Sequence, residues 1–388
     1  MRRIYMDANA TTPVLPEVVE CMRPFWSEHF GNASSIHQPG QQARAAVDRA
    51  RNSVAALLNC RAAEIVFTSG GTESDNMAIF GVLSPGDHLI TSSIEHHAVL
   101  HAAQELEARG IDVTFLTSTS NGFIEVAALE AAIRPTTKLV SVMYANNETG
   151  VIQPIRELAD KAHAAGALFH TDAVQAAGKL SLDVKSLGCD LLSISGHKMY
   201  APQGTGALFV RRNVRLKSMF FGGLHERGRR PGTENVAGIV GLGKAAEVAQ
   251  AWLAGSGADQ LASLRDRLEQ GILSAVPDSG VNGAPLQRVA NTSNFYFDEV
   301  EAEALVIALD LKGLAVSGGS ACQSGATEPS HVLTAMGLSD ARARGSLRFS
   351  LSRLNTSDEV DAALTLIPAA VARLRVLSPN KLAPATAH

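Results

Sequence analysis

Short segments rich in β-forming residues alternate with helical segments through most of this chain. The predicted strands cover residues 64–69, 88–91, 113–116, 139–144, 168–171, 191–195 and 207–210. Helical patterns lie between most of them, at residues 98–109, 126–133 and 155–165. This alternation predicts an α/β fold with a mostly parallel sheet covered by helices on both faces. Ligands of such sheets bind at the carboxyl ends of the strands, so polar residues there are candidates for a functional site.

The pattern changes after Gly255-Ser256-Gly257, which we take as the predicted domain boundary. Helices are expected beyond it at residues 260–276 and 302–311, and strands near 292–297 and 346–350. This part of the chain therefore predicts a smaller α+β domain. A length of 388 residues is consistent with two domains.

Composition and charge exclude several classes of function. Hydrophobic residues make up 46% of the chain and charged residues 19%, so we expect a large core and no global disorder. The formal net charge of −4 provides no basic surface for nucleic acid or an anionic membrane. No apolar run approaches the roughly 18 residues that a membrane-spanning helix needs. The start, MRRIYMDANATTP, lacks the apolar segment of a signal peptide, so we expect a cytoplasmic protein that begins there.

Polar residues gather where the predicted parallel strands end. They are Thr72, Glu95-His96-His97, Asn146-Asn147-Glu148, Asp172 with Gln175, and Ser195 with His197 and Lys198. Each group alone is compatible with an ordinary polar loop. Because the carboxyl ends of parallel strands share one edge of a sheet, however, we expect these groups to lie close together.

Two of these groups indicate specific chemistry. Lys198 follows the buried strand 191–195, where it is either a solvated loop residue or a desolvated amine able to form a Schiff base. Gly70-Gly71 and Thr72 connect the strand 64–69 to the apolar helix 77–82. That order suits a bound phosphate, and it equally suits a plain N-capped helix.

The four cysteines are too few and too dispersed for a disulfide framework or a Cys-x-x-Cys zinc site. Cys21, Cys60 and Cys189 are expected to be small buried apolar residues. Cys322 differs, because it lies in the polar loop SGGSACQSGATEPS, where a thiol is able to ionise. It is a candidate nucleophile, and the alternative is an incidental exposed thiol.

The basic segment FFGGLHERGRRPGTEN is either a solvated loop or a binding surface for a phosphate or a neighbouring subunit.

Taken together, the motifs closely resemble the cysteine desulfurases of the NifS/IscS type, which belong to the class-V aminotransferases. The resemblance runs from Ile4 to about Pro379. The matching stretches are DANATT, FGNASSIH, TSGGTESDN, EHHAVL, ANNETG, HTDAVQAAGK, SGHKMYAPQGTGAL, HERGRRPGTEN, GSACQSGATEPSHVL and SLRFSLSR. The resemblance implies pyridoxal 5'-phosphate (PLP) as cofactor and the PLP fold type I. It also implies a large PLP-binding domain over residues 14–255. The small domain is then residues 1–13 plus 256–388, with the cysteine loop at about 317–330.

The resemblance also assigns roles to individual residues. Lys198 matches the Schiff-base lysine, and Asp172 the acid that pairs with the pyridinium nitrogen. Gln175 is expected to donate to the phenolic oxygen of the ring. His96 is expected to stack on the ring and to move protons at the substrate. The residues expected at the phosphate are Gly71, Thr72, Ser195 and His197, with Thr233 from the second subunit of a homodimer. Asn147, beside the cofactor, and Arg348 are expected to hold the substrate carboxylate.

The implied reaction converts L-cysteine to L-alanine and leaves the sulfur as a persulfide on Cys322. An iron–sulfur scaffold or another acceptor protein would then take the sulfur, and Cys322 could briefly serve as a cluster ligand shared with that scaffold. Within this family, the stretches ERGRRPGTEN and SLSR favour the nitrogen-fixation branch over the housekeeping branch. The alternatives are a selenocysteine lyase, a PLP aminotransferase and a non-enzymatic assembly scaffold. The sulfur acceptor stays open, because Gln323 and Gly325-Ala326 vary the loop that is expected to select it.

Overall fold

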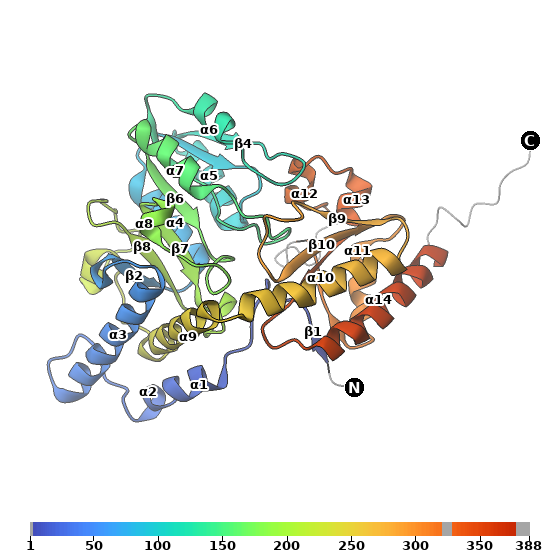
Figure 1. The fold of residues 1–388 in the computed structure, drawn as a ribbon. Coiled ribbons are helices and arrows are strands. Elements are labelled where there is room, and N and C mark those ends of the chain that lie inside the picture. The colour runs from blue at the N-terminus through green and yellow to red at the C-terminus, as the bar shows by residue number, and fades with distance from the viewer. Residues whose placement is uncertain (1–2, 320–327, 378–388) are drawn as a thin grey trace, which may run out of the picture.

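The structure is a computed structural model that describes residues 3–319 and 328–377 (Figure 1). A large sheet has the strand order β2-β8-β7-β6-β5-β3-β4. Its strands are β2 (Ile65–Thr68), β3 (His88–Ser92), β4 (Asp112–Leu116), β5 (Thr137–Ser141), β6 (Leu168–Asp172), β7 (Leu191–Ser195) and β8 (Gly206–Val210). All neighbouring pairs are parallel except those of β8, which runs antiparallel to both β7 and β2. The predicted mostly parallel sheet is therefore confirmed.

Helices cover both faces of the large sheet, because its strands alternate their apolar side chains between two cores. Leu191 of β7 packs in one core, which α4 (Gly71–Val82) and α5 (His97–Ala108) complete. Leu192 packs in the other core. The helices on that side include α3 (Gln38–Leu57), α6 (Val126–Ala132), α7 (Ile155–Ala164), α8 (Val184–Leu187) and α9 (Val236–Ala254). With both faces covered, the edge of the sheet is where a ligand gains access.

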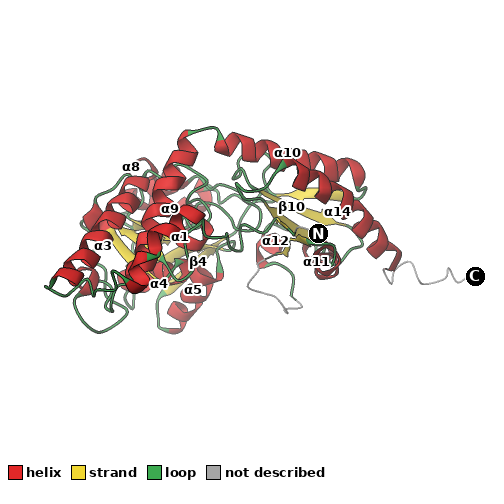
Figure 2. Ribbon diagram, turned by 90° about the horizontal axis from the view of Figure 1, so that it is seen from below, coloured by secondary structure: helices red, strands yellow, loops and turns green. Residues whose placement is uncertain are grey.

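The smaller part of the molecule is an antiparallel sheet covered by helices. Its strands are β9 (Ser279–Asn282), β10 (Thr292–Phe297), β12 (Ser317–Gly318) and β13 (Ser346–Ser350), in the order β12-β13-β10-β9. The long helices α10 (Gly257–Ala275) and α14 (Ser357–Leu377) run side by side along it (Figures 1 and 2). Shorter helices are α11 (Ala302–Asp310), α12 (His331–Ala335) and α13 (Asp340–Arg344). Gly255 and Ser256, where the domain boundary is predicted, separate α9 from α10.

The N-terminal segment joins the two parts. Strand β1 (Ile4–Tyr5) pairs in parallel with β11 (Leu314–Ala315) of the smaller part. The N–H of Ala8 then donates to the carbonyl of Ser350 over 2.9 Å, and the N–H of Thr12 donates to the carbonyl of His197 over 2.9 Å. The segment therefore crosses directly from the small sheet to the loop that carries Lys198.

Three local expectations were wrong. The helical spacing of residues 16–28 predicts one helix, whereas the structure has two short helices, α1 (Pro16–Met22) and α2 (Pro24–Ser27), because proline cannot donate the hydrogen bond that a continuous helix requires. The helix expected from residue 77 begins already at Gly71. Cys21 is exposed and Cys60 half-buried, whereas Cys189 is buried as expected. Helix α1 turns Val18 and Met22 inward, which leaves Cys21 facing solvent.

Within the described part of the chain, no helix is both long and apolar enough to cross a membrane.

Candidate active site

A cavity of about 220 Å³ lies at the carboxyl ends of the parallel strands of the large sheet. Its lining combines strand-end residues with others from the N-terminal segment and β13. The lining residues are Asn9, Ala10, Gly71, Thr72, Asp75, His96, Met143, Asn147, Asp172, Val174, Gln175, Ser195, His197, Lys198 and Arg348. The sequence-based candidates Gly71, Thr72, His96, Asn147, Asp172, Gln175, Ser195, His197, Lys198 and Arg348 are thus brought together. Their individual roles stay predictions.

Lys198 ends the short 3-10 helix η2 (Gly196–Lys198) that follows β7. Its Nζ donates to the backbone carbonyls of Asn9, over 2.5 Å, and Ala10, over 2.7 Å. Burial lowers the pKa of the neighbouring His96 and His197 to about 4, and the charge of Lys198 acts in the same direction. Both imidazoles are therefore neutral near neutral pH. Their neutrality leaves the amine as the basic group at this point of the pocket.

Asp172 ends β6 and is almost completely buried. One carboxylate oxygen accepts the N–H of Val174 over 2.8 Å. Burial raises the pKa of Asp172 to about 6, although the N–H of Val174 and the charge of Lys198 oppose the rise. Asp75, from α4, is also buried, and burial together with the charge of Asp172 raises its pKa well above its usual value. Since two buried carboxylates resist ionising together, the negative charge lies on Asp172, which has the stabilising partners.

The opposite end of the pocket is built for an anion. Gly71 and Thr72 begin α4, a helix long enough to present free N–H groups at its N-terminus. A Cβ on Gly71 would lie only 2.7 Å from Cγ2 of Val174, so the close approach requires glycine. Ser195 ends β7 beside this turn. The Nδ1 atom of His197 is 3.0 Å from the hydroxyl of Thr11, which fixes the ring.

His96 caps the N-terminus of α5 with its ring. Its Nδ1 accepts the N–H of Ala98 over 3.1 Å. Because Nδ1 is the acceptor, the proton of the neutral ring lies on Nε2. His96 therefore brings a neutral aromatic face and one N–H donor to the lining of the pocket.

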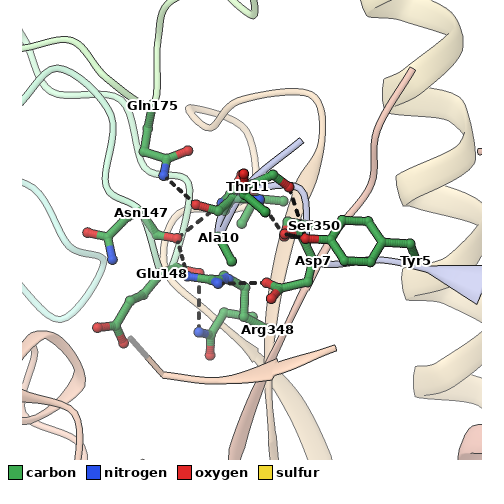
Figure 3. Close-up of polar contacts among 12 residues, drawn as sticks. Tyr5, Asp7, Ala10, Thr11, Asn147, Glu148, Gln175, Arg348 and Ser350 are labelled. Carbon is green, nitrogen blue, oxygen red and sulfur yellow. Dashed lines mark hydrogen bonds and ion pairs between the residues drawn. The ribbon is translucent and has the colours of Figure 1, made fainter. Parts of the chain in front are cut away.

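Arg348 comes from β13 of the small sheet and is only 1% exposed. Its guanidinium forms an ion pair with Asp7 over 2.8 Å and donates to the backbone carbonyl of Asn147 over 2.9 Å (Figure 3). The Nε of Arg348 and the side-chain oxygen of Asn147 are buried and have no hydrogen-bond partner among residues 3–319 and 328–377. A buried guanidinium with an unused donor beside the cavity is suited to a carboxylate ligand.

Sequence reasoning missed the part that Asp7 and Asn9 play, although it singled out the motif DANATT. The side chain of Asn9 donates to the carbonyl of Asn147 over 3.1 Å and to the hydroxyl of Thr292 over 2.9 Å. Its oxygen accepts from Asn291 over 3.0 Å. Asn9 thus links both domains at the pocket. The sequence shows only that Asp7 and Asn9 belong to a polar, extended segment. Their partners are distant in the chain, so no local pattern predicts them.

One expected site residue, Thr233, lies outside this pocket. Thr233 is exposed in the loop before α9 and does not line the cavity of its own chain. The segment around it is tied down by internal ion pairs, because Arg230 pairs with Glu73 and Glu226 pairs with the buried Arg51. Cys322 falls outside the described residues. Among residues 3–319 and 328–377, no three histidine, cysteine or acidic side chains are arranged to hold a metal ion.

The comparisons with known proteins agree with this geometry. The model of the aminotransferase class-V family matches residues 4–363. The chain is 50% identical to cysteine desulfurase 2 of Trichormus variabilis over 382 residues, which cover 98% of this chain and 96% of the relative. A solved structure titled NifS-like protein has a TM-score of 0.90 at 34% identity, covering 96% of this chain and all of that one. Another, titled SspA in complex with cysteine, has a TM-score of 0.80 at 38% identity, covering 91% of this chain and 100% of that one.

Fold and pocket thus define a PLP-type α/β enzyme scaffold of fold type I, with a lysine at the centre of the site. The chain belongs to the class-V aminotransferase family and, within it, to the cysteine desulfurases.

The residues of the pocket fit PLP, the cofactor of this family. Lys198 offers an amine for the aldehyde, and Asp172 a buried carboxylate for the ring nitrogen. The N-terminus of α4 and Ser195 offer donors for the phosphate. The donor set therefore matches each functional group of the cofactor, and the lining atoms without partners on Asn147 and Arg348 leave donors and acceptors for a substrate.

Proposed function

We propose that this enzyme is a cysteine desulfurase that converts L-cysteine to L-alanine and places the sulfur on Cys322 as a persulfide. The observation that carries the proposal is the convergence of Lys198, Asp172 and Arg348 on one cavity, each contributed by a different element. An amine, a buried carboxylate and a buried guanidinium are the groups that bind an amino acid next to PLP. PLP supplies the electron sink for the carbon next to the amino acid carboxylate.

The residues of this chain then bind the substrate and move its protons. Arg348, oriented by Asp7, holds the substrate carboxylate together with Asn147. Lys198 takes the proton from the α-carbon as a neutral amine and returns it later in the reaction. His96, neutral and with its proton on Nε2, covers the ring and donates at the substrate.

Cys322 supplies the nucleophile that the sulfur requires. Its thiolate attacks the sulfur of the substrate, a sulfur–sulfur bond forms and the carbon–sulfur bond breaks. The carbon fragment keeps the electron pair, takes up a proton and leaves as L-alanine. L-cysteine and one thiol thus give L-alanine and one persulfide, with no outside oxidant or reductant. The persulfide sulfur is then available to an acceptor, which we propose is an iron–sulfur scaffold protein.

The proposal includes a homodimer in which Thr233 of one subunit reaches the phosphate end of the other pocket. Thr233 is exposed, and its segment is held rigidly by the Arg230–Glu73 pair. Large apolar side chains are exposed on nearby loops: Phe30 at 74%, Ile36 at 91%, Phe221 at 98% and Leu224 at 88%. Where such side chains form a contiguous patch they mark an interaction surface, and we propose that these loops contribute to the dimer interface. Sedimentation equilibrium is expected to give twice the mass of the chain, and Thr233→Ala is expected to weaken retention of PLP on dialysis.

The test of the proposed function measures both products. The purified chain with bound PLP, L-cysteine and dithiothreitol is expected to release alanine and sulfide in equal amounts. Cys322→Ser is expected to lower the rate of both by about 100-fold or more, because the nucleophile is lost. Cys21→Ser is the matched control, since Cys21 is an exposed thiol of the same chain. It is expected to behave like the wild-type enzyme.

Other outcomes would replace the proposal. Consumption of a keto acid with full activity in Cys322→Ser would identify an aminotransferase. Activity on L-selenocysteine with none on L-cysteine would identify a selenocysteine lyase. A chain that binds no PLP and releases no alanine would support a non-enzymatic scaffold.

A further inference from the structure

Lys179 is a second lysine beside the pocket, and the proposed chemistry does not use it. It lies in the turn after β6, where its N–H donates to the carbonyl of Ala176 over 2.9 Å. The preceding Gly178 has a φ of 74°, and a Cβ there would lie 3.1 Å from the Cβ of Met199. Since Met199 follows Lys198, the turn that carries Lys179 is packed directly against the segment that carries Lys198.

The side chain of Lys179 fixes the orientation of the Gln175 amide. Its Nζ donates to the side-chain oxygen of Gln175 over 2.7 Å and to that of Asn9 over 2.9 Å. The amide nitrogen of Gln175 donates to the backbone carbonyl of Asn9 over 3.0 Å. A flipped amide would place its N–H groups against the N–H groups of Lys179. Lys179 therefore fixes which end of the amide is oxygen, and it leaves the second N–H of the Gln175 nitrogen for another acceptor.

Lys179 and Lys198 are bound to different oxygens of the same residue. Lys198 donates to the backbone carbonyl of Asn9, and Lys179 to its side-chain oxygen. Burial lowers the pKa of Lys179 well below its usual value, and the positive charges of Lys198 and Arg348 act in the same direction. Electrostatic repulsion is mutual, so a proton on Lys179 also disfavours a proton on Lys198.

The charged or titratable groups around Lys198 come from both domains. They are Asp75, His96, Asp172, Lys179, His197, Tyr200, Arg348 and Arg353. The two histidines are neutral near neutral pH, and Asp172 favours a proton on Lys198. The charge of Arg348 is offset by Asp7. Within the described part of the chain, the Nζ of Lys179 donates to neutral amide oxygens and not to an acid, so a positive charge on Lys179 acts on Lys198 without an opposing charge.

We propose that Lys179 is a positioning residue of the active site, which orients the Gln175 amide towards the cofactor and keeps Lys198 in the free-amine form. This inference rests on the proposed function, because it concerns the base of that reaction. The nitrogen of Lys198 can carry a proton both as an amine and when it is bonded to PLP. A positive charge on Lys179 disfavours that proton in either form of Lys198.

The experiment is a pH titration of the visible absorption of bound PLP, in the absence of substrate. Lys179→Met is expected to raise the midpoint of that titration by about one pH unit or more, because the neighbouring positive charge is removed. The acid limb of the pH profile of kcat is expected to move in the same direction. Lys179→Arg keeps the charge and is expected to keep the midpoint close to that of the wild-type enzyme.

Lys138→Met is the matched control, because Lys138 is an exposed lysine on β5 of the same domain. It is expected to leave the midpoint unchanged. If Lys179→Met fails to fold by circular dichroism, Lys179→Gln replaces it, with the same expected direction. A neutral variant that titrates like the wild-type enzyme overturns the inference, and so does an arginine variant that shifts as much as the neutral one. Both outcomes leave the proposed function intact, whereas that function fails if the wild-type enzyme binds PLP but produces no alanine.

Discussion

The two sides of the pocket are built in different ways. On the strand-end side, Asp172, Ser195 and Lys198 sit at or just beyond the last residues of β6 and β7, which the large sheet fixes. On the N-terminal side, Asp7 and Asn9 are held by contacts with residues more than 130 positions away in the chain. The sheet therefore places the groups that do the chemistry, whereas substrate binding depends on how the N-terminal segment and β13 dock. Substitutions on the strand-end side are expected to lower kcat, and substitutions on the N-terminal side are expected to raise KM.

The largest effect is expected for Asp172→Asn. The variant loses the buried charge that we propose pairs with the ring nitrogen, so kcat for alanine formation is expected to fall by about a thousandfold or more. Asp160→Asn, a change of an exposed acid on α7, is the control and is expected to keep full activity. A small loss in Asp172→Asn would show that the strand-end side does not carry the chemistry.

Arg348→Gln is expected to have the next largest effect. It removes a buried guanidinium that is available for a bidentate pair with the substrate carboxylate, so KM for L-cysteine is expected to rise by about 100-fold. Steady-state kinetics over a wide range of cysteine concentrations measures the change. An unchanged KM with a collapsed kcat would place Arg348 among the groups of the chemical step.

Asp7→Asn tests the N-terminal side separately from direct substrate contacts, because we expect Asp7 to act by orienting Arg348. Loss of the 2.8 Å ion pair is expected to raise KM by about tenfold and to leave kcat nearly unchanged. The control is Asp310→Asn, an exposed acid that pairs with Arg3 on the small domain. If the two variants behave alike, the ion pair of Asp7 has no positioning role.

The smallest effect concerns stability and pH on the strand-end side. Burial raises the pKa of Glu95 from 4.5 to about 8. The folded state then keeps a proton that the unfolded state loses, so this part of the stability is present below pH 4.5 and declines as pH rises towards 8. In the wild-type enzyme the free energy of unfolding is expected to fall between pH 4.5 and pH 8. In Glu95→Gln that fall is expected to be smaller by about 1–3 kcal/mol, as measured by urea unfolding at the two pH values. Glu107→Gln, on the exposed face of α5, is expected to leave the decline in place.

The strand-end side could be predicted from the sequence because its signals are local. The strand 191–195 was predicted with the bounds that the structure shows, since it is a short apolar run that ends at a glycine turn. The polar residues next to such runs then had to meet at one edge of a parallel sheet. The turn at Gly71, where we propose the phosphate binds, was likewise visible as a glycine pair between a strand and a helix.

The N-terminal side could not be predicted in the same way. Asp7 and Arg348 are separated by 341 positions, and no periodic pattern connects them. No local signal singled out Lys179, because its partner Asn9 lies 170 positions away in the chain. The exposure of Cys21 was missed for a related reason, since the short helix α1 has few apolar residues to define its buried face.

Borohydride reduction of the PLP-loaded enzyme, followed by peptide mass spectrometry, tests most directly which amine anchors the cofactor. Reduction makes the bond between PLP and its lysine permanent, so the labelled peptide identifies the residue. We predict that the label lies on Lys198 and is absent from Lys179. A label on Lys179, or a protein that binds PLP without any labelled lysine, would contradict the assignment of Lys198 as the centre of this active site.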